Sequence, residues 1–427
     1  MPPMSSPARR VAAIAVLLLS LAIGAVLGLR GMGFQIGFGP FASATPAVAT
    51  ATPEPSGPPP SQDLLTAFGQ IAAQVRDLRG LPAADIGSPQ ILTRAELTEE
   101  LAALFEKNLP PAERDAENAT LRALGLLTTD QDLVELLQNL LTDQVLGFYE
   151  FDRKRIVVAT DAGLTATARM TYAHEYTHAL QDAAFDSAAA HDALNGKDDA
   201  EAARVALEEG DASIAGVLWG IGHLTAEELL DIQQTPIPDT FGVPAWMVRQ
   251  LDFPYLAGVE FVSQLYASGG WDAVDAAYAD PPSSTEQVLH PTKYIDDEAP
   301  LPVNPLDLWS AVGSDWAQAS DTTMGEEWMA IWLEGIGVDP KVASMAAAGW
   351  GGDRLTVANA TDGRLVLGWR IAWDAPIEAT EFETAYAGVQ SRLPFAARVI
   401  HVSDRETIVL QASSAALLDA IATLVAG

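Results

Sequence analysis

The chain has 427 residues, which allows two or three domains with a large buried core, and 49% of its residues are hydrophobic. Its 24 basic and 57 acidic side chains give a formal net charge of −33, which repels nucleic acid phosphates and anionic lipid and excludes both as partners of the folded part. The absence of cysteine excludes disulfides, thiolate catalysis and cysteine-ligated metals. We attribute the acidity to solubility or salt tolerance, and the alternative is the capture of cations or basic substrates.

An uninterrupted apolar run at residues 11–29 is long enough to cross a bilayer as a helix. Arg9 and Arg10 precede the run and only Arg30 follows it, and this bias places the N-terminus in the cytoplasm. We therefore expect residues 1–30 to anchor a single-pass protein in the cell membrane, with its folded part extracytoplasmic. The alternative is a cleaved signal peptide, which would make the protein secreted, although the apolar core of such a peptide usually runs only about 7–15 residues.

The segment after the anchor changes character twice before the first motif. Residues 31–62 are rich in Gly, Ala, Thr and Pro without an apolar period, which indicates a spacer. From residue 63 to about 143, apolar residues recur every three or four positions, which predicts a helical N-terminal subdomain. "VLGFYEFDRKRIVVAT" then places aromatic and β-branched residues on both sides of a polar turn, so we expect a β-hairpin whose edge strand could pair with an extended peptide.

The segment "HEYTHALQD" lies in a helix that we expect from about Thr167 to Phe185. Four residues advance a helix by about 400°, so His174 and His178 lie on one face, one turn apart, and their imidazoles can bind the same ion. Glu175 is offset by one residue and can reach a water on that ion without being a ligand. This is the arrangement that makes H-E-x-x-H a hydrolase motif.

A second long helix carries the acids Glu208, Glu209 and Asp211 in "ALEEGDAS". Two histidines leave a tetrahedral zinc ion one protein ligand short of a catalytic site, and one of these acids could supply it. Gly210 costs about 1 kcal/mol relative to alanine inside a helix, so we expect it where this helix packs closely on another. The motif helix is the natural partner.

Beyond residue 300 the chain alternates strand-like and helix-like segments, which predicts an α+β module over residues 301–427. We expect strands at 354–359, 364–373, 397–403 and 406–413, a helix at 378–393 and a closing helix. Two further segments have plain structural interpretations. "STEQVLHPTKY" resembles a capped helix that ends at Pro291, and "GWGGDR" a glycine-rich turn before a strand.

"HEYTHALQD" and "EEGDAS" resemble the motifs of the gluzincin, or thermolysin-like, zinc metallopeptidases. The chain is also similar to a family of largely uncharacterised bacterial exported proteins that combine these two motifs with counterparts of "STEQVLHPTKY" and "GWGGDR". The resemblance implies that Zn²⁺ is bound by His174, His178 and Glu209, with Glu175 as general base. Glu208 is the alternative third ligand.

One position departs from the thermolysin-like pattern. That pattern has an acid four residues after the ligand glutamate to orient a histidine, and this chain has Ser213 there. We expect Asp182 or Asp211 to take over this role. As donors to the developing oxyanion we expect His290 first and Tyr294 second, because thermolysin-like enzymes carry a donor histidine downstream of the ligand helix. A purely structural role of this loop is the alternative.

Together these patterns predict a mainly α protein with α+β parts. A helical gluzincin-like core over residues 144–300 begins with the hairpin and is followed by the C-terminal α+β module. We expect a membrane-anchored, extracytoplasmic zinc metallopeptidase that hydrolyses a peptide or protein substrate with a metal-activated water. The alternatives are a zinc-stabilised, non-catalytic binding or assembly protein on the same scaffold, and an acidic cation-binding surface protein in which the motif is fortuitous. We expect no functional role for His191, His223 and His401.

Overall fold

The structure is a computed structural model that describes residues 62–141, 145–160, 163–194, 196–234 and 242–425. The expected membrane anchor at residues 11–29 and the spacer that follows it lie outside the described residues. Among the described residues, none of the helices combines the length and the apolar content that a membrane span requires.

The expected N-terminal helices are present in the described part of the chain as α3 (Gln62–Arg79), α4 (Arg94–Asn108), α5 (Pro111–Ala123) and α6 (Leu133–Leu141). Thr93 caps α4, because its hydroxyl accepts a hydrogen bond from the backbone N–H of Glu96 and the Glu96 carboxylate accepts one from that of Thr93. A short strand, β1 (Gln90–Leu92), is not predicted, since three residues are too few to show a period of two.

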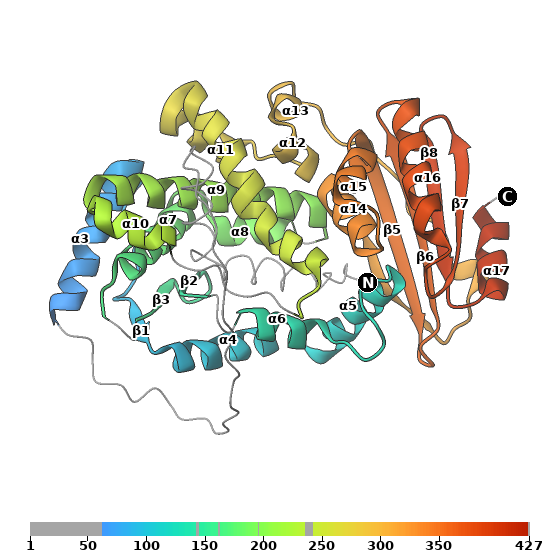
Figure 1. Cartoon of the computed structure of the whole chain (residues 1–427), viewed down its shortest axis with the longest axis horizontal. Coiled ribbons are helices and arrows are strands. Elements are labelled where there is room, and N and C mark those ends of the chain that lie inside the picture. Colours follow the sequence, from blue (N-terminus) through green and yellow to red (C-terminus); the bar gives the residue numbers. More distant parts are fainter. Residues whose placement is uncertain (1–61, 142–144, 161–162, 195, 235–241, 426–427) are drawn as a thin grey trace.

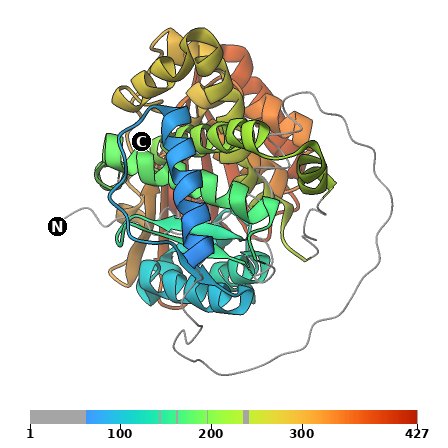
Figure 2. The same cartoon turned by 90° about the vertical axis from the view of Figure 1, so that its left-hand side faces the viewer.

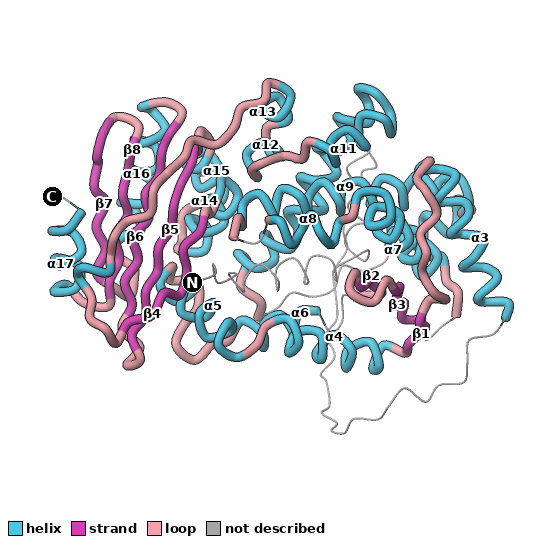
Figure 3. Tube along the Cα trace, turned by 180° about the vertical axis from the view of Figure 1, so that it is seen from behind, coloured by secondary structure: helices cyan, strands magenta, loops and turns pink. Residues whose placement is uncertain are grey.

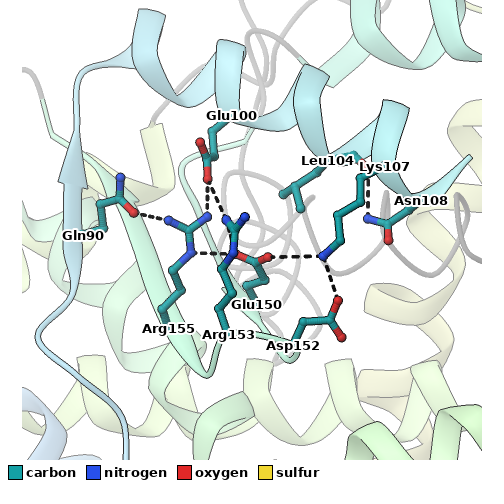
Figure 4. Close-up of polar contacts among 9 residues, drawn as sticks. All are labelled: Gln90, Glu100, Leu104, Lys107, Asn108, Glu150, Asp152, Arg153 and Arg155. Atoms are coloured by element: carbon teal, nitrogen blue, oxygen red, sulfur yellow. Dashed lines mark hydrogen bonds and ion pairs between the residues drawn. The ribbon is translucent and has the colours of Figure 1, made fainter. Parts of the chain in front are cut away.

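The expected hairpin is confirmed as β2 (Gly147–Glu150) and β3 (Arg155–Ala159), which pair antiparallel. β1 adds to β3 in parallel, so the small sheet has the order β1-β3-β2 and β2 lies at one edge. Figure 4 shows the charged network that ties this hairpin to α4. In it, Arg155 Nε donates to Glu150 at 2.6 Å and Lys107 Nζ donates to Asp152 at 2.8 Å.

Long helices cover the small sheet and occupy the middle of the molecule (Figures 1 and 3). The long ones are α7 (Ala166–Phe185), α9 (Asp198–His223) and α11 (Ala245–Ala279), and the shorter helices α8 (Ser187–Ala193) and α10 (Ala226–Gln234) come between them in the chain. The backbone of α11 leaves helical geometry at Gly269 and Gly270. In Figure 2, α3 stands upright in front of the other helices, and it packs mainly on α7 and α9.

Gly210 does mark a close helix contact, but the expected partner was wrong. A Cβ at Gly210 would lie 2.2 Å from the carbonyl oxygen of Gly258 in α11, and a Cβ at Gly258 would lie 2.1 Å from that of Ala206. The two glycines therefore let the backbones of α9 and α11 touch. The motif helix α7 instead meets α9 at Gly216, whose Cβ position lies 3.7 Å from that of His174. The sequence indicates that a close contact exists, but not which helix makes it.

A five-stranded antiparallel sheet forms the C-terminal end of the molecule (Figure 1), in the order β4-β5-β6-β8-β7. Its strands are β4 (Trp316–Thr322), β5 (Trp350–Ala360), β6 (Leu365–Trp373), β7 (Ala396–Ser403) and β8 (Glu406–Ala412). The helical elements of this region are α12 (Thr285–Leu289), α13 (Pro291–Ile295), η1 (Trp309–Ala311), α14 (Gly325–Gly335), α15 (Pro340–Ala347), α16 (Pro376–Gln390) and α17 (Ala415–Val425). The four expected strands and two expected helices are confirmed, and β4, α14 and α15 are additions.

The prediction of a turn at "GWGGDR" was wrong, because β5 begins at Trp350 and includes both glycines that follow it. A Cβ at Gly352 would lie 2.3 Å from the carbonyl oxygen of Leu301, and Leu301 N donates to Gly351 O at 2.6 Å. The glycines thus allow a preceding loop to pack directly on the strand backbone.

One hydrophobic core joins the N-terminal helices to the large sheet. Trp332 on α14 donates its indole N–H to the carbonyl of Leu124 at 2.9 Å, and Trp246 on α11 donates to that of Leu126 at 3.2 Å. Both indoles are buried, so these bonds satisfy polar groups inside the core. The fold is thus mainly α with α+β parts, with a β-hairpin before the motif helix and an α+β module at the C-terminus.

Candidate metal centre

The motif helix α7 is buried on all sides, which is unusual for a helix with this many polar side chains. Every residue from Met170 to Asp182 is buried. Tyr172 and Leu180 pack into the same hydrophobic cluster as α3 and the small sheet. The backbone of His174 lies against Gly216 of α9. The histidines of the motif therefore project from a rigid element toward another rigid element, which is how a preorganised site is built.

The structure brings the three expected ligands together. His174 Nε2 lies 3.0 Å from His178 Nε2 and 3.1 Å from Glu209 Oε2, and His178 Nε2 lies 3.5 Å from the same oxygen. All three side chains are fully buried. In the described part of the chain, they form one of two groups whose ligand atoms all lie within 4.8 Å of one another.

These distances fit a tetrahedral zinc ion. Ligand atoms at about 2.0–2.1 Å from such an ion would be about 3.3–3.4 Å from one another, and the observed separations bracket this value. Two imidazoles and one carboxylate are also a donor set that zinc prefers. Without a proton or a cation, three lone-pair-bearing atoms would face one another in a fully buried site, so the residues present fit Zn²⁺.

The pKa shifts of the three side chains also bear on cation binding. Burial lowers the pKa of His174, which favours the neutral imidazole that a metal ligand must be. Burial would raise the pKa of Glu209, but the charge of His178 and the hydrogen bond with His174 outweigh it and lower this pKa. For His178, the charge of Glu209 outweighs burial and raises the pKa, so metal binding must release a proton from this residue.

Gln181 fixes the orientation of His178. Its amide N–H₂ donates to the carbonyl of Glu208 and to Asp211 Oδ2, both at 3.0 Å. Both partners only accept hydrogen bonds, so the amide oxygen must face His178 Nδ1, at 2.8 Å. Nδ1 must then carry the proton, and the lone pair of a neutral His178 lies on Nε2, toward the other ligands.

Asp211 is held in turn by Arg79, the last residue of α3. Arg79 Nε donates to Asp211 Oδ1 at 2.7 Å and Nη2 donates to Oδ2 at 3.1 Å. Nη2 also donates to Asp275 at 2.7 Å, and the guanidinium lies 4.2 Å from the ring centre of Trp271. Of the two expected orienting acids, Asp211 thus acts through Gln181. Asp182 instead accepts from the hydroxyl of Tyr149 at 3.0 Å.

Tyr255 of α11 is a site residue that the sequence reasoning missed. It is buried, and its hydroxyl hydrogen-bonds Glu209. Burial and the charges of Glu209 and Glu175 raise its pKa well above the ordinary value, so the phenol keeps its proton and remains a donor. Glu175 itself is fully buried. No spacing rule links Tyr255 to the motif, since it lies in the interior of a long apolar helix next to Pro254.

Glu208 does not face the two histidines of the motif. Its carboxylate accepts from Arg204 Nε at 2.8 Å and lies 2.8 Å from His191 Nε2. Burial would raise its pKa, but the charges of His191 and Arg204 lower it strongly. Glu208 and Glu209 are neighbours on one helix, but they point to different partners. Glu208 belongs to an ion-pair network with Arg204 and His191, whereas Glu209 faces the histidines of the motif. His191 thus has a structural contact. The same holds for His401, whose Nδ1 lies 3.0 Å from Glu383.

The structure does not bring His290 and Tyr294 to the histidines. His290 Nε2 lies 2.9 Å from Glu326 Oε1 of α14, and the hydroxyl of Tyr294 donates to the carbonyl of Asp280 at 2.8 Å. In the described residues, neither side chain contacts the three ligand atoms. Ser284 caps α12 by accepting from Gln287 N, which fits the plain interpretation of this segment as a capped helix.

The two remaining motifs meet in a second polar cluster, between α9, α12, α13 and the large sheet. Lys293 donates to Glu286 at 2.8 Å and to Glu298 at 2.5 Å, and it also pairs with Asp374. The carboxylate of Asp353, from "GWGGDR", accepts from the backbone N–H groups of Met324 and Gly325 and from the indoles of Trp350 and Trp369. We call these residues the junction cluster. They join the helical core to the large sheet.

Comparison with known proteins bears on the C-terminal region alone. Residues 315–422 match a family described as "Domain of unknown function (DUF8575)". The match runs from just before β4 into α17 and does not include any residue of the metal centre. Neither the curated proteins nor the solved structures gave a match to the chain.

Proposed function

We propose that the chain is a membrane-anchored, extracytoplasmic zinc metallopeptidase, as its resemblance to the gluzincins implies. The observation that carries this proposal is the convergence of His174 Nε2, His178 Nε2 and Glu209 Oε2 at zinc-ligand spacing, with Glu175 on the same helix. The apolar run at residues 11–29 supports the anchor.

Each residue of the site has a role in hydrolysis. Zinc, when bound, would polarise a water and lower its pKa. Glu175 accepts the proton of the attacking water on a carboxylate oxygen and passes it to the nitrogen of the leaving amine. Gln181 keeps the lone pair of His178 on Nε2, and Asp211 and Arg79 hold Gln181 in place.

Tyr255 is the oxyanion donor that the contacts favour. Negative charge develops on the former carbonyl oxygen during attack, and a preorganised O–H group lowers its energy. The phenol of Tyr255 lies beside Glu209 and Glu175 and stays protonated. His290 and Tyr294 stay predictions for this role, and their present contacts favour a structural one.

A second candidate is a zinc-stabilised protein without turnover. The complete burial of the two histidines and of Glu175 and Glu209 favours it, because a peptide must reach the site to be cut. Structural zinc sites, however, almost always have four protein ligands, and the described residues supply three. A buried glutamate beside the first histidine also has no purpose in a purely structural site.

Hydrolysis of a degenerate peptide library separates the two candidates. The wild-type protein should cut it, and Glu175→Gln should retain zinc while losing at least about 10²-fold in rate, because the general base is removed and the ligands remain. Zinc binding without hydrolysis in the wild type supports the non-catalytic candidate. Equal rates in both proteins would show that Glu175 is not the base.

A further inference from the structure

A groove of about 490 Å³ lies along the first turns of α11, between this helix, α12 and α14. Its residues come mainly from the α11 segment that precedes and follows Tyr255, with Leu289 from α12 and Glu327 from α14. α11 packs on α9 as well as on α12 and α14, as the position of these elements in Figure 1 illustrates. The groove and the metal centre thus share one helix.

The wall of the groove is mostly apolar. Val248, Phe253 and Leu256 line it from α11, opposite Leu289. Leu256 is 48% exposed, so about half of its surface is open to a ligand. This wall suits an aliphatic chain rather than a fully polar group.

The charged residues of the groove leave one negative charge without a partner. Arg249 is neutralised, because it donates to both carboxylate oxygens of Glu327, at 2.8 and 3.0 Å, and to Glu334 at 2.9 Å. Asp252 has no such partner. Its Oδ1 is shielded from solvent and has no hydrogen bond within the described residues. Burial raises the pKa of Asp252 to about 6, so the group is still ionised at neutral pH.

Asp252 also lies close to the proposed catalytic machinery. It precedes Tyr255 by three residues, which places the two side chains on adjacent positions of one helix, about one turn apart. The charge of Asp252 acts on the phenol of Tyr255, whose hydroxyl hydrogen-bonds Glu209. The groove therefore adjoins, along one helix, the tyrosine that hydrogen-bonds the ligand Glu209.

We propose that this groove binds a lysine or arginine side chain of the substrate, next to the bond that is cut. The inference rests on the proposed peptidase function and names its substrate class. The aliphatic stem of the basic side chain packs along Val248 and Leu256, and its cationic end pairs with Asp252. A neutral or acidic side chain of the same length leaves the partly buried carboxylate without a partner, which is costly.

Peptide binding to the full-length zinc protein tests the proposal. The Glu175→Gln variant is titrated with fluorescent alanine-rich peptides that carry one central lysine, arginine, norleucine or glutamate. It should bind the lysine and arginine peptides about tenfold or more tightly than the norleucine peptide, as a charge-assisted bond predicts. Adding Asp252→Asn should abolish this preference. Adding Glu260→Gln, at an exposed acid on the same helix, should preserve it.

Hydrolysis of the same peptides by the wild type shows whether the groove proposal or the proposed peptidase function is wrong. Hydrolysis without a basic preference, or a preference that survives Asp252→Asn, overturns the groove proposal and leaves the peptidase. A basic preference in binding without any hydrolysis supports the groove and overturns the peptidase. No binding and no hydrolysis overturns both. Equal zinc content in all variants excludes misfolding as the cause.

Discussion

The metal centre is fully buried and the junction cluster is partly exposed, and the two polar groups, both built from motif residues, balance their charges differently. Glu286, Glu298 and Asp374 in the junction gather around the ammonium of Lys293, so the cation is part of the chain. At His174, His178 and Glu209, no lysine or arginine of the described residues contacts the three ligand atoms. A cluster that contains its own cation is complete as a structural element, whereas the other requires a proton or a metal.

The hydrogen bonds of the two sites show the same difference. Asp353 in the junction has four donors, two from backbone and two from indoles. The ligand atoms of the metal centre converge on one another, and Gln181 donates away from the site so that the lone pair of His178 points into it. The motif "GWGGDR" therefore serves to join two parts of the fold, and "HEYTHALQD" is the part suited to chemistry.

Tyr255→Phe should give the largest effect that separates the two regions. Removing the hydroxyl should lower kcat by about 10²–10³, the cost of one lost oxyanion donor, with zinc content unchanged. Steady-state peptide hydrolysis measures this. His290→Ala and Tyr294→Phe, in the loop of the junction cluster, are the matched comparison and should retain wild-type rates. A rate loss in either of these two with none in Tyr255→Phe would place the donor in the loop.

Lys293→Met should act on the fold instead of the chemistry. It leaves three neighbouring carboxylates without their cation, and because the site is partly exposed we expect a loss of about 2–3 kcal/mol in the free energy of unfolding. Urea denaturation measures the loss, and zinc affinity should not change. If the free energy of zinc binding weakened by as much as the free energy of unfolding, the two clusters would be one coupled unit.

Gln181→Leu should lower zinc affinity by about 10- to 100-fold, since the partner that orients a metal-bound histidine is lost. Competition with a chelator measures the affinity. Gln74→Leu is the control, because Gln74 is also an amide whose oxygen accepts a hydrogen bond inside the fold, at 2.9 Å from the indole nitrogen of Trp219. The same fall in both variants would mean that lost stability, and not the orientation of His178, determines affinity.

Asp199, at the start of α9, contacts Thr285 of α12 and should make the stability of this region modestly sensitive to pH. Burial raises the pKa of this carboxyl to about 7, even though it accepts hydrogen bonds from Thr285. Between about pH 4 and pH 7 the folded protein therefore binds a proton at Asp199 that the unfolded chain does not, and this contribution to stability is lost as the pH rises.

Asp199→Asn removes the titrating group and keeps an acceptor oxygen. As the pH rises from 4.5 to 8, the variant should gain at least about 1 kcal/mol in the free energy of unfolding relative to the wild type, because only the wild type loses stability at Asp199. Denaturant unfolding at several pH values measures the difference. A difference that does not vary with pH would contradict the raised pKa.

The sequence predicts the parts of this molecule that depend on local spacing. Helical geometry predicts that His174 and His178 lie on the same face of their helix. Residue type and period predict the hairpin and the four C-terminal strands. The choice of Glu209 over Glu208 came only from the resemblance, since neighbouring acids on a helix point in different directions that depend on how the helix is turned. In the structure, Glu208 contacts Arg204 and His191, and Glu209 faces the two histidines of the motif.

The features that the sequence does not predict depend on contacts between distant segments. Arg79 reaches Asp211 across 132 positions of the chain, and Tyr255 reaches Glu209 from a third helix. β4, α14 and α15 lack a pattern clear enough to separate them from the loops around them. Gly210 signals a close contact, but only the packed structure identifies α11 as the partner.

Zinc content of the purified protein tests the central claim most directly. The wild type should carry about one zinc per chain, because the three ligand atoms form a preorganised site. Glu209→Ala should lose the metal, and Glu286→Gln, in the acidic group that Lys293 already neutralises, should keep it. A wild-type protein that binds no zinc when zinc is supplied, or a Glu209→Ala variant that keeps one zinc per chain, would contradict the account.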